Sequence, residues 1–324
     1  MRQRMMPIAF MFGAMVAFAF AQAPPATGPM EGKGHTALVH SIAISPDGKT
    51  IATAGFDKTV RLWEIKDAKL VEVKSILAHN DPVYAVAFSP DGKFLATSSL
   101  DKTMKTWTMP EAKMDKEFKG HTDIVGSVSW SPDGKNLVTA GGMADKSVRV
   151  WNSVDGKELK NLGMHTGSVY SVTFSPDGKF VASSGADNLV RIWDVAAGKE
   201  SKQLKGHDMP VTGVVYGKDV SSVISVSQDR TVRVWNTADG KELKKYGPTA
   251  DDLFGIARGK DAKNVATIGY SGIVSIREVE TGKEIFTFRI RSPGYAIALT
   301  ADGNSILSGH DNGTLQLTPV TPKK

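Results

Sequence analysis

The sequence has no cysteine and only a small excess of basic residues. The absence of cysteine from 324 residues excludes disulfides, a lipid-modified cysteine and thiol chemistry. Lysine and arginine number 40 against 34 acidic residues, and outside residues 1–21, which carry Arg2 and Arg4, they number 38. No basic stripe or basic helix gathers this excess, so we expect no nucleic-acid partner.

Signals for catalysis are also missing. The sequence contains no nucleophile–base arrangement, no metal-ligand spacing and no Gly-x-Gly-x-x-Gly loop that opens a helix. Its glycines fall in turns instead. We therefore predict no catalytic residue, no metal and no cofactor.

The N-terminus reads as an export signal. Arg2 and Arg4 precede an uncharged, mostly apolar run, Met5–Phe20, and Ala19-Phe20-Ala21 supplies a small-x-small cleavage pattern. A retained membrane anchor is the alternative, but this run falls short of the ~20 residues that span a bilayer. The sequence predicts a signal peptide at 1–21, a flexible lead-in at 22–29, and a periplasmic or secreted protein with no stable membrane insertion after cleavage.

One turn recurs along the rest of the chain at an almost fixed interval. Ser-Pro-Asp-Gly stands at Ser45–Gly48, Ser89–Gly92, Ser131–Gly134 and Ser175–Gly178. Tryptophan follows at a matching interval, at Trp63, Trp107, Trp151, Trp193 and Trp235. Periods of about 40–45 residues are typical of repeat architectures, so function should be sought on surfaces that several repeats build together.

Each repeat reads as four short strands. In the clearest unit the strands are expected at Val169–Phe174, Phe180–Ser184, Leu189–Asp194 and Glu200–Lys205. Turn residues separate them about every 10 residues, which is typical of an antiparallel meander. Proline presets the backbone of the Ser-Pro-Asp-Gly turn, and Asp and Gly tolerate the conformations that a tight hairpin needs.

The unit can be aligned seven times. Its turn aspartates are Asp57, Asp101, Asp145, Asp187, Asp229 and Asp311, with Ser271 in the sixth unit. Histidine opens five units, at His35, His79, His121, His165 and His207. Through Gly34-His35, Gly120-His121, Gly206-His207 and Trp193-Asp194 the chain resembles the WD-repeat family of β-propellers, and exported bacterial-type members in particular. The resemblance covers residues 30–320.

The resemblance implies a structural role for the repeated polar residues. In the family, His, Ser or Thr, Asp and Trp of one unit form a buried hydrogen-bonded chain at the top of a blade. Here the two sets with serine are His165, Ser183, Asp187 and Trp193, and His207, Ser225, Asp229 and Trp235. The sixth unit has Ser271 and Arg277 in place of Asp and Trp, and the seventh lacks His and Trp. These last two units should be the least rigid.

Seven units predict an all-β fold with one seven-bladed propeller over residues 30–320 and a tail at 321–324. After Leu317 only seven residues remain, too few for a turn and a fourth strand. The outer strand of the last blade should therefore come from Met30–Gly34. Gly32 and Gly34 lower the β propensity of that strand.

The two faces of the disc should differ. The bottom face carries the Pro-Asp-Gly-Lys and Gly-Lys-Glu turns, whose alternating charges predict a solvated surface. The top face carries the histidine loops, the turn aspartates and the starts of the innermost strands. We predict partner-binding residues there, at His40, Phe56, Tyr84, Leu100, Tyr170, Thr212, Phe254, Tyr270, Tyr295 and His310. The alternative is that these rings plug the channel mouth and pack between blades.

Together these features predict an exported, non-catalytic scaffold that binds a protein or peptide partner on its top face. One alternative is a catalytic or small-ligand propeller that uses the central channel, since fold alone does not settle function. Such a site would need several carboxylates or histidines at the inner strand starts, where one histidine stands among mostly aromatic residues. Another is a self-assembling structural component of the cell envelope. A monomer is favoured.

Overall fold

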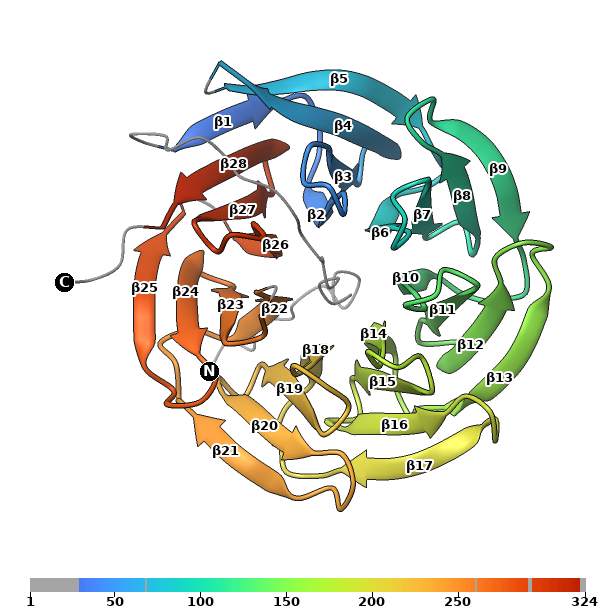
Figure 1. Cartoon of the computed structure of the whole chain (residues 1–324), viewed down its shortest axis with the longest axis vertical. Coiled ribbons are helices and arrows are strands. Elements are labelled where there is room, and N and C mark those ends of the chain that lie inside the picture. Colours follow the sequence, from blue (N-terminus) through green and yellow to red (C-terminus); the bar gives the residue numbers. More distant parts are fainter. Residues whose placement is uncertain (1–28, 68, 260, 291–292, 321–324) are drawn as a thin grey trace, which may run out of the picture.

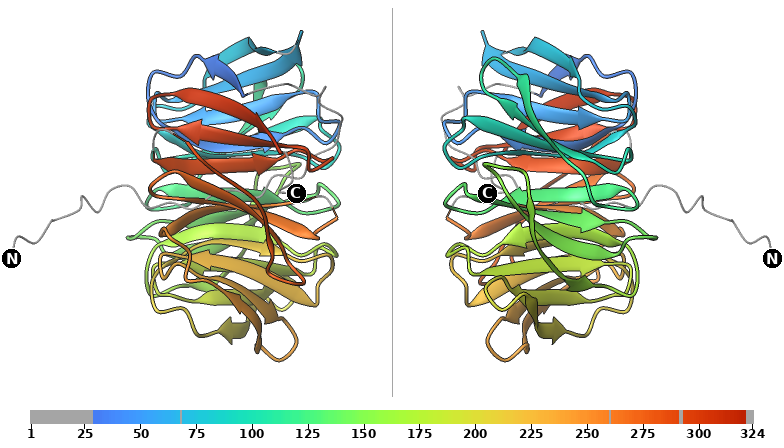
Figure 2. Two further views of the ribbon diagram at one scale, coloured as in Figure 1. Left: turned by 90° about the vertical axis from the view of Figure 1, so that its left-hand side faces the viewer. Right: turned by 90° about the vertical axis from the view of Figure 1, so that its right-hand side faces the viewer.

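Seven four-stranded antiparallel sheets form a closed ring in the computed structural model (Figure 1). The structure describes residues 29–67, 69–259, 261–290 and 293–320, so the predicted signal peptide, most of the lead-in and the tail lie outside the described residues. The all-β seven-bladed propeller predicted from the repeats is confirmed. Viewed edge-on, the ring is a thick disc with loops on both faces (Figure 2).

Each of blades 1–6 is built from four consecutive strands. Blades 1–3 comprise β2 (Val39–Ile44), β3 (Ile51–Gly55), β4 (Thr59–Lys66) and β5 (Lys69–Leu77); β6 (Val83–Phe88), β7 (Phe94–Ser99), β8 (Met104–Thr108) and β9 (Lys113–Phe118); β10 (Val125–Trp130), β11 (Asn136–Gly141), β12 (Ser147–Asn152) and β13 (Glu158–Met164). Blades 4–6 comprise β14 (Val169–Phe174), β15 (Phe180–Gly185), β16 (Val190–Asp194) and β17 (Lys199–Leu204); β18 (Val211–Tyr216), β19 (Ser222–Ser227), β20 (Val232–Asn236) and β21 (Glu242–Tyr246); β22 (Leu253–Arg258), β23 (Asn264–Gly269), β24 (Ile273–Glu278) and β25 (Glu284–Arg289).

Blade 7 closes the ring with strands from both ends of the described chain. It comprises β26 (Gly294–Leu299), β27 (Ser305–His310), β28 (Thr314–Pro319) and, as its outer strand, β1 (Met30–Lys33). β1 runs antiparallel to β28, with Met30 opposite Leu317. The predicted closure by the N-terminal strand is confirmed.

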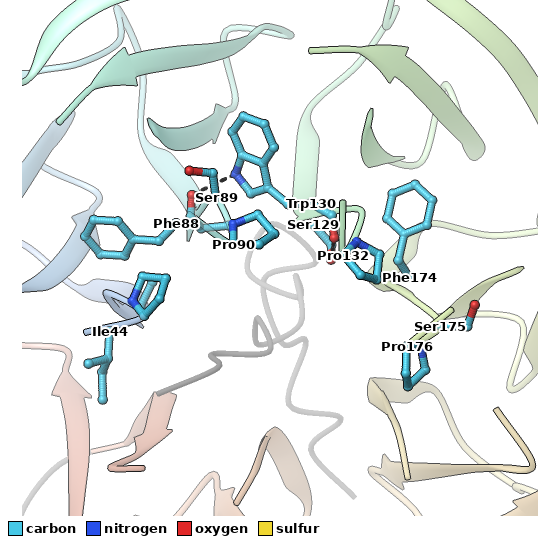
Figure 3. Close-up of a pocket in the computed structure, with 13 residues that line it drawn as sticks. Ile44, Phe88, Ser89, Pro90, Ser129, Trp130, Pro132, Phe174, Ser175 and Pro176 are labelled. Atoms are coloured by element: carbon cyan, nitrogen blue, oxygen red, sulfur yellow. Dashed lines mark hydrogen bonds between the residues drawn. The ribbon is translucent and has the colours of Figure 1, made fainter. Parts of the chain in front are cut away.

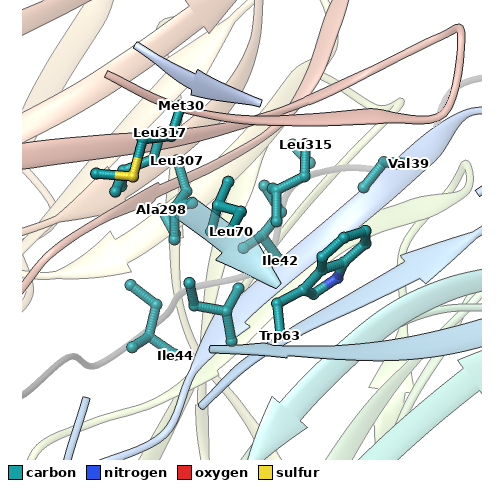
Figure 4. Packing of buried hydrophobic residues seen from close by; sticks show 12 residues of the cluster. Met30, Val39, Ile42, Ile44, Trp63, Leu70, Ala298, Leu307, Leu315 and Leu317 are labelled. Atoms are coloured by element: carbon teal, nitrogen blue, oxygen red, sulfur yellow. The ribbon is translucent and has the colours of Figure 1, made fainter. Parts of the chain in front are cut away.

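The closing strand is anchored by packing against the first blade. Met30 is buried in one hydrophobic cluster with Trp63, Leu70 and Leu317 (Figure 4). Gly32 has a specific reason to be glycine, because a Cβ there would lie 2.8 Å from Cζ3 of Trp63. Gly32 lowers the β propensity of this strand, but its missing side chain allows the strand to lie against the tryptophan ring.

The Ser-Pro-Asp-Gly turns are held by their own side chains. In the fourth blade the hydroxyl of Ser175 donates to Asp177 Oδ1 over 2.6 Å, and the backbone NH of Phe180 donates to Ser175 Oγ over 2.9 Å. Gly178 has a φ of 72°, in the left-handed region that favours glycine. Hydrogen bonds and a glycine within the turn itself therefore end the innermost strand and begin the second one.

Candidate functional site

A buried hydrogen-bonded chain fixes the top of the fourth blade. The indole NH of Trp193 donates to Ser183 Oγ over 2.7 Å, and that hydroxyl lies 2.7 Å from His165 Nε2. On the other side of the ring, His165 Nδ1 lies 2.9 Å from Asp187 Oδ1. Because a carboxylate only accepts, Nδ1 is the donor and Nε2 of the neutral ring accepts from the serine.

The same arrangement is repeated in the other blades that have both His and Trp, except that in blade 3 His121 Nδ1 lies 3.2 Å from Asp145 Oδ1 without forming a hydrogen bond. The sets are His35, Thr53, Asp57 and Trp63; His79, Thr97, Asp101 and Trp107; His121, Thr139, Asp145 and Trp151; and His207, Ser225, Asp229 and Trp235. Each set stays within its own blade. The histidines and aspartates are therefore distributed around the ring rather than gathered into one centre.

An arginine extends the chain in four blades, and sequence reasoning missed it. In blade 5, Arg233 Nη2 lies 3.3 Å from Asp229 Oδ2 and its Nη1 lies 2.8 Å from Glu242 Oε2. Arg61, Arg149 and Arg191 are placed in the same way. The signal was available in the sequence, because these arginines stand two residues before each tryptophan.

The pKa shifts of His165 and Asp187 are those expected of a structural hydrogen-bonded pair. Burial would raise the pKa of Asp187, but the hydrogen bond from His165 and further donors hold that pKa well below its usual range. Burial lowers the pKa of His165, although Asp187 opposes the shift. Both groups are thus kept in the forms that hydrogen-bond to each other. Among the described residues, no group of three His, Cys, Asp or Glu side chains is placed to hold a metal ion.

A β-bulge stands at the channel mouth of every blade. In the fourth blade the pairing of β14 with β15 shifts register between Val169 and Ser171, so Tyr170 is the extra residue. The other extra residues are His40, Tyr84, Gly126, Thr212, Phe254 and Tyr295. These are the seven positions that the repeat register assigns to the inner strand starts. A bulge re-aims a side chain, so all seven share a local geometry that the sequence alone did not reveal.

Burial divides the ten predicted partner-binding residues into three groups. His40, Tyr84, Tyr170, Thr212 and His310 are buried. Phe56, Phe254 and Tyr295 are half-buried, and only Leu100 and Tyr270 are exposed, at 41% and 45%. The buried members provide packing and ties between blades. His40 Nδ1, for example, lies 2.7 Å from the carbonyl of Tyr84, and Thr212 Oγ1 donates to the carbonyl of Leu253 over 2.8 Å.

The structure brings several of these rings together. The rings of His40, Phe56 and Tyr84 all contact one another: Phe56 lies 5.3 Å from His40 and 4.8 Å from Tyr84, and His40 lies 4.7 Å from Tyr84 between centroids. Phe254 contacts Tyr270 and Tyr295, each at 5.8 Å. The ring of Tyr295 also stacks on His40 at 6.4 Å, so the two clusters meet. Aromatic side chains from blades 1, 2, 6 and 7 therefore line one part of the top mouth.

Exposed apolar side chains gather on the top face. Of the twelve large hydrophobic side chains exposed among the described residues, six lie in its loops or at strand ends that reach it. We call these six residues the top-face set: Leu77, Leu100, Met143, Met164, Met209 and Tyr270. Of the other six, Val154 lies in a bottom turn, and Met114, Leu159 and Leu243 each stand one residue inside the bottom end of an outer strand. Of the top-face set, the sequence-based prediction contained only Leu100 and Tyr270, although the repeat register places the other four in loops or at strand ends on the same face.

The bottom mouth of the channel holds a second apolar surface that the sequence reasoning missed. A cavity of about 280 Å³ is lined by the last residues of four innermost strands, Ile44, Phe88, Trp130 and Phe174, and by the turn prolines (Figure 3). Ile44, Trp130 and Phe174 are buried, and the indole NH of Trp130 donates to the carbonyl of Ala87 over 3.1 Å. The signal was an apolar residue directly before each Ser-Pro-Asp-Gly turn.

Among the described residues, no helix is long and apolar enough to cross a membrane.

Comparison with known proteins adds the family. The chain is 45% identical over 38 residues to Ribosome assembly protein 4 of Saccharomyces cerevisiae, a match that covers 12% of this chain and 7% of that protein. It is 63% identical over 30 residues to Notchless protein homolog of Arabidopsis thaliana, covering 9% and 6%. Each match is about one repeat long.

The family comparison covers far more of the chain. The family model for the WD domain, G-beta repeat, matches residues 30–64, 70–108, 113–152, 156–194 and 198–236. The matched segments make up more than half of the chain and include all five complete polar sets. With seven four-stranded blades and these repeats, the chain belongs to the WD40 repeat family.

Proposed function

We propose that this protein is an exported, non-catalytic scaffold that binds a protein or peptide partner through the top face of its propeller. WD40 propellers typically act as protein-interaction scaffolds. The predicted signal peptide at residues 1–21 supports export to the periplasm or the exterior. The similarity to Ribosome assembly protein 4 is confined to one repeat, so it carries no proposal about ribosomes.

The top-face set is the observation that carries the choice of face. Six exposed apolar side chains stand there, whereas the bottom has Val154 in a turn and Met114, Leu159 and Leu243 near the ends of outer strands. Three of the six are methionines, whose flexible thioethers adapt to different partner surfaces. Tyr270 adds a rigid ring with a polar tip, the kind of side chain that dominates recognition surfaces.

Catalysis in the channel finds less support from the geometry. The histidine at the channel mouth, His40, is buried and holds the carbonyl of Tyr84. The other histidines paired with aspartates are divided among separate blades. A self-assembling envelope component would bury the same apolar residues, so light scattering after size-exclusion chromatography distinguishes it from the monomeric scaffold.

Partner capture by mature protein tests the proposal. The immobilised chain from Gln22 onward is exposed to the envelope fraction of its source, in parallel with Leu100→Asp combined with Tyr270→Ala. Captured proteins should be lost with this variant and kept with Val154→Asp, the matched exposed residue on the other face. Capture that survives the top-face changes and fails with Val154→Asp would move the binding surface to the bottom.

A further inference from the structure

The sixth blade contains a cavity at the place where other blades hold their polar chain. It measures about 360 Å³ and is lined by Thr249, Asp251, Thr267, Ser275, Arg277, Glu284 and Thr287, together with Pro248, Ala250, Leu253 and Ile273. By register, Thr249 takes the place of the histidine, Ser275 that of the arginine and Arg277 that of the tryptophan. Replacement of histidine and arginine by the smaller threonine and serine, and of tryptophan by arginine, thus leaves space for a group of several heavy atoms.

In four sibling blades, one guanidinium group bridges an aspartate and a glutamate in this position. Arg233 does so in blade 5, where Nη2 approaches Asp229 at 3.3 Å and Nη1 approaches Glu242 at 2.8 Å. Arg149 does the same in blade 3, with distances of 3.3 and 2.9 Å. Planar guanidinium suits such a site because its donors form a fixed fork.

Blade 6 keeps the glutamate in the same register. Glu284 lies opposite Arg277 in the pairing of β24 with β25, just as Glu242 lies opposite Trp235 in blade 5. Its Oε2 accepts from the hydroxyl of Ser275 over 3.3 Å. The residue that would carry the bridging guanidinium is thus a serine that reaches the same carboxylate with a shorter side chain.

The second carboxylate comes from a different segment of the chain. The turn aspartate is replaced by Ser271, but Asp251 of the preceding loop accepts from the backbone NH of Ser271. The carboxylate of Asp251 lies against Gly269, as the imidazole of His35 and the carboxylate of Asp57 lie against Gly55 in blade 1. Blade 6 therefore presents an aspartate and a glutamate on one cavity, as its siblings do.

One cation already lines this cavity. Arg277 donates through Nη1 to the carbonyl of Gly282 over 2.7 Å, and its Nη2 lies 3.5 Å from Glu284 Oε2. Gly282 belongs to a bottom turn, so this guanidinium is held toward the bottom end of the cavity. Asp251 lies at the other end, beside the top-face turn. Two carboxylates and one guanidinium group thus line the cavity.

We propose that the cavity of blade 6 binds a guanidinium group, supplied by a small molecule or by an arginine side chain of a bound peptide. The group takes the position of the arginine that blades 1, 3, 4 and 5 provide themselves, with Glu284 and Asp251 as its acceptors. An ammonium group is a poorer match because it lacks the fixed fork of donors of a guanidinium group. Blade 2, which has lysine in place of the arginine, also has Met114 in place of the glutamate, and there Lys105 Nζ donates to the carbonyl of Ala78. The upper end of the site, at Asp251, adjoins the top-face loop that carries Tyr270.

Calorimetric titration with methylguanidinium tests the site directly. Binding should be observed at millimolar concentrations, and methylammonium at equal ionic strength should bind at least about tenfold more weakly, a difference of about 1.4 kcal/mol. Glu284→Gln should weaken methylguanidinium binding by a similar factor. Equal binding of the two cations, or no binding of methylguanidinium, would overturn the proposal.

Ser275→Arg gives the sharper variant because it restores the bridging side chain of the sibling blades. It should abolish methylguanidinium binding and raise the melting temperature, while the matched Ser275→Ala leaves binding within about twofold. Binding that persists in Ser275→Arg would place the ligand elsewhere and refute the assignment. Titration with an acetylated, amidated arginine then distinguishes the sources. Binding at least about tenfold tighter than methylguanidinium favours a peptide side chain, and equal binding favours a small molecule.

Discussion

The imidazole of His165 and the carboxylate of Asp187 lie 2.9 Å apart at the top of blade 4, and both side chains are almost completely buried. Burial lowers the pKa of His165, and burial likewise lowers that of His207, each against the opposing effect of its aspartate. The unfolded chain therefore binds protons at these histidines at a higher pH than the folded chain does. Protonation favours unfolding as pH falls below about 6.5, the ordinary histidine pKa.

We expect the free energy of unfolding to decrease as the pH is lowered from 7.5 to 5.5. The lowered pKa of Asp187 acts in the same direction but only nearer pH 4, because its stabilisation is lost as pH falls below the unfolded value. Urea unfolding at the two pH values measures the slope. His165→Asn should reduce it, and a stability that rises on acidification would contradict the interpretation.

The hydrogen-bonded polar residues should contribute more to the free energy of unfolding in a blade that has the full His, Ser or Thr, Asp and Trp set than in a blade that lacks part of it. Asp187→Ala removes the acceptor of His165 and of Arg191, leaving buried donors unpaired at a cost of about 1–3 kcal/mol. Ser271→Ala should cost much less, since the contacts of Ser271 shown by the structure use its backbone NH and carbonyl. Denaturant midpoints compare the two variants. Equal losses would show that the blade networks have been assigned incorrectly.

Closure of the ring should depend on the space beside Trp63. Gly32→Val places a branched side chain where even a Cβ would come within 2.8 Å of Cζ3 of the indole ring. We expect destabilisation of about 1–3 kcal/mol, in the range of overpacked cores. Glu31→Val is the matched control, because the neighbouring residue is exposed on the same strand. A Gly32→Val variant as stable as the control would mean that β1 contributes little to closure.

Export gives a prediction that is independent of the folded structure. If residues 1–21 form a cleaved signal peptide, N-terminal sequencing of the protein from the periplasm or medium should begin at Gln22. Changing Ala21 to a bulky residue should block this cleavage. Exported protein that still begins at Met1 would instead favour a retained segment.

Local chemistry explains which parts of the fold could be predicted from the sequence. The strand expected at Val169–Phe174 is observed with the same ends, because its alternation and its Ser-Pro-Asp-Gly turn are written in neighbouring residues. The bulge at Tyr170 was not predicted, because it depends on how two strands pair. Ring closure by Met30–Lys33 was predictable by counting strands.

The site was harder to predict than the fold because burial depends on residues far apart in sequence. The register placed Tyr84 at the channel mouth, but its 3% exposure results from the rings of His40 and Phe56 against it. Asp251 could not be recognised as a replacement carboxylate, since it lies in a different loop from the turn it contacts. The bottom cavity likewise needs four strand ends from four blades to meet.

The final prediction separates packing from recognition within the aromatic residues of the top mouth. Tyr84 is 3% exposed and contacts two rings, with centroids 4.7 and 4.8 Å away, whereas Tyr270 is 45% exposed. Removing a buried aromatic side chain costs about 3–5 kcal/mol, so Tyr84→Ala should lower the melting temperature by several degrees. Tyr270→Ala should leave the melting temperature nearly unchanged and weaken partner capture, since truncating a recognition anchor costs about 2 kcal/mol, roughly thirtyfold in affinity. Melting curves and capture are measured on both variants. If Tyr270→Ala captures its partner normally, the exposed ring is not an anchor, and the proposed contact must shift to the methionines and leucines of the top-face set.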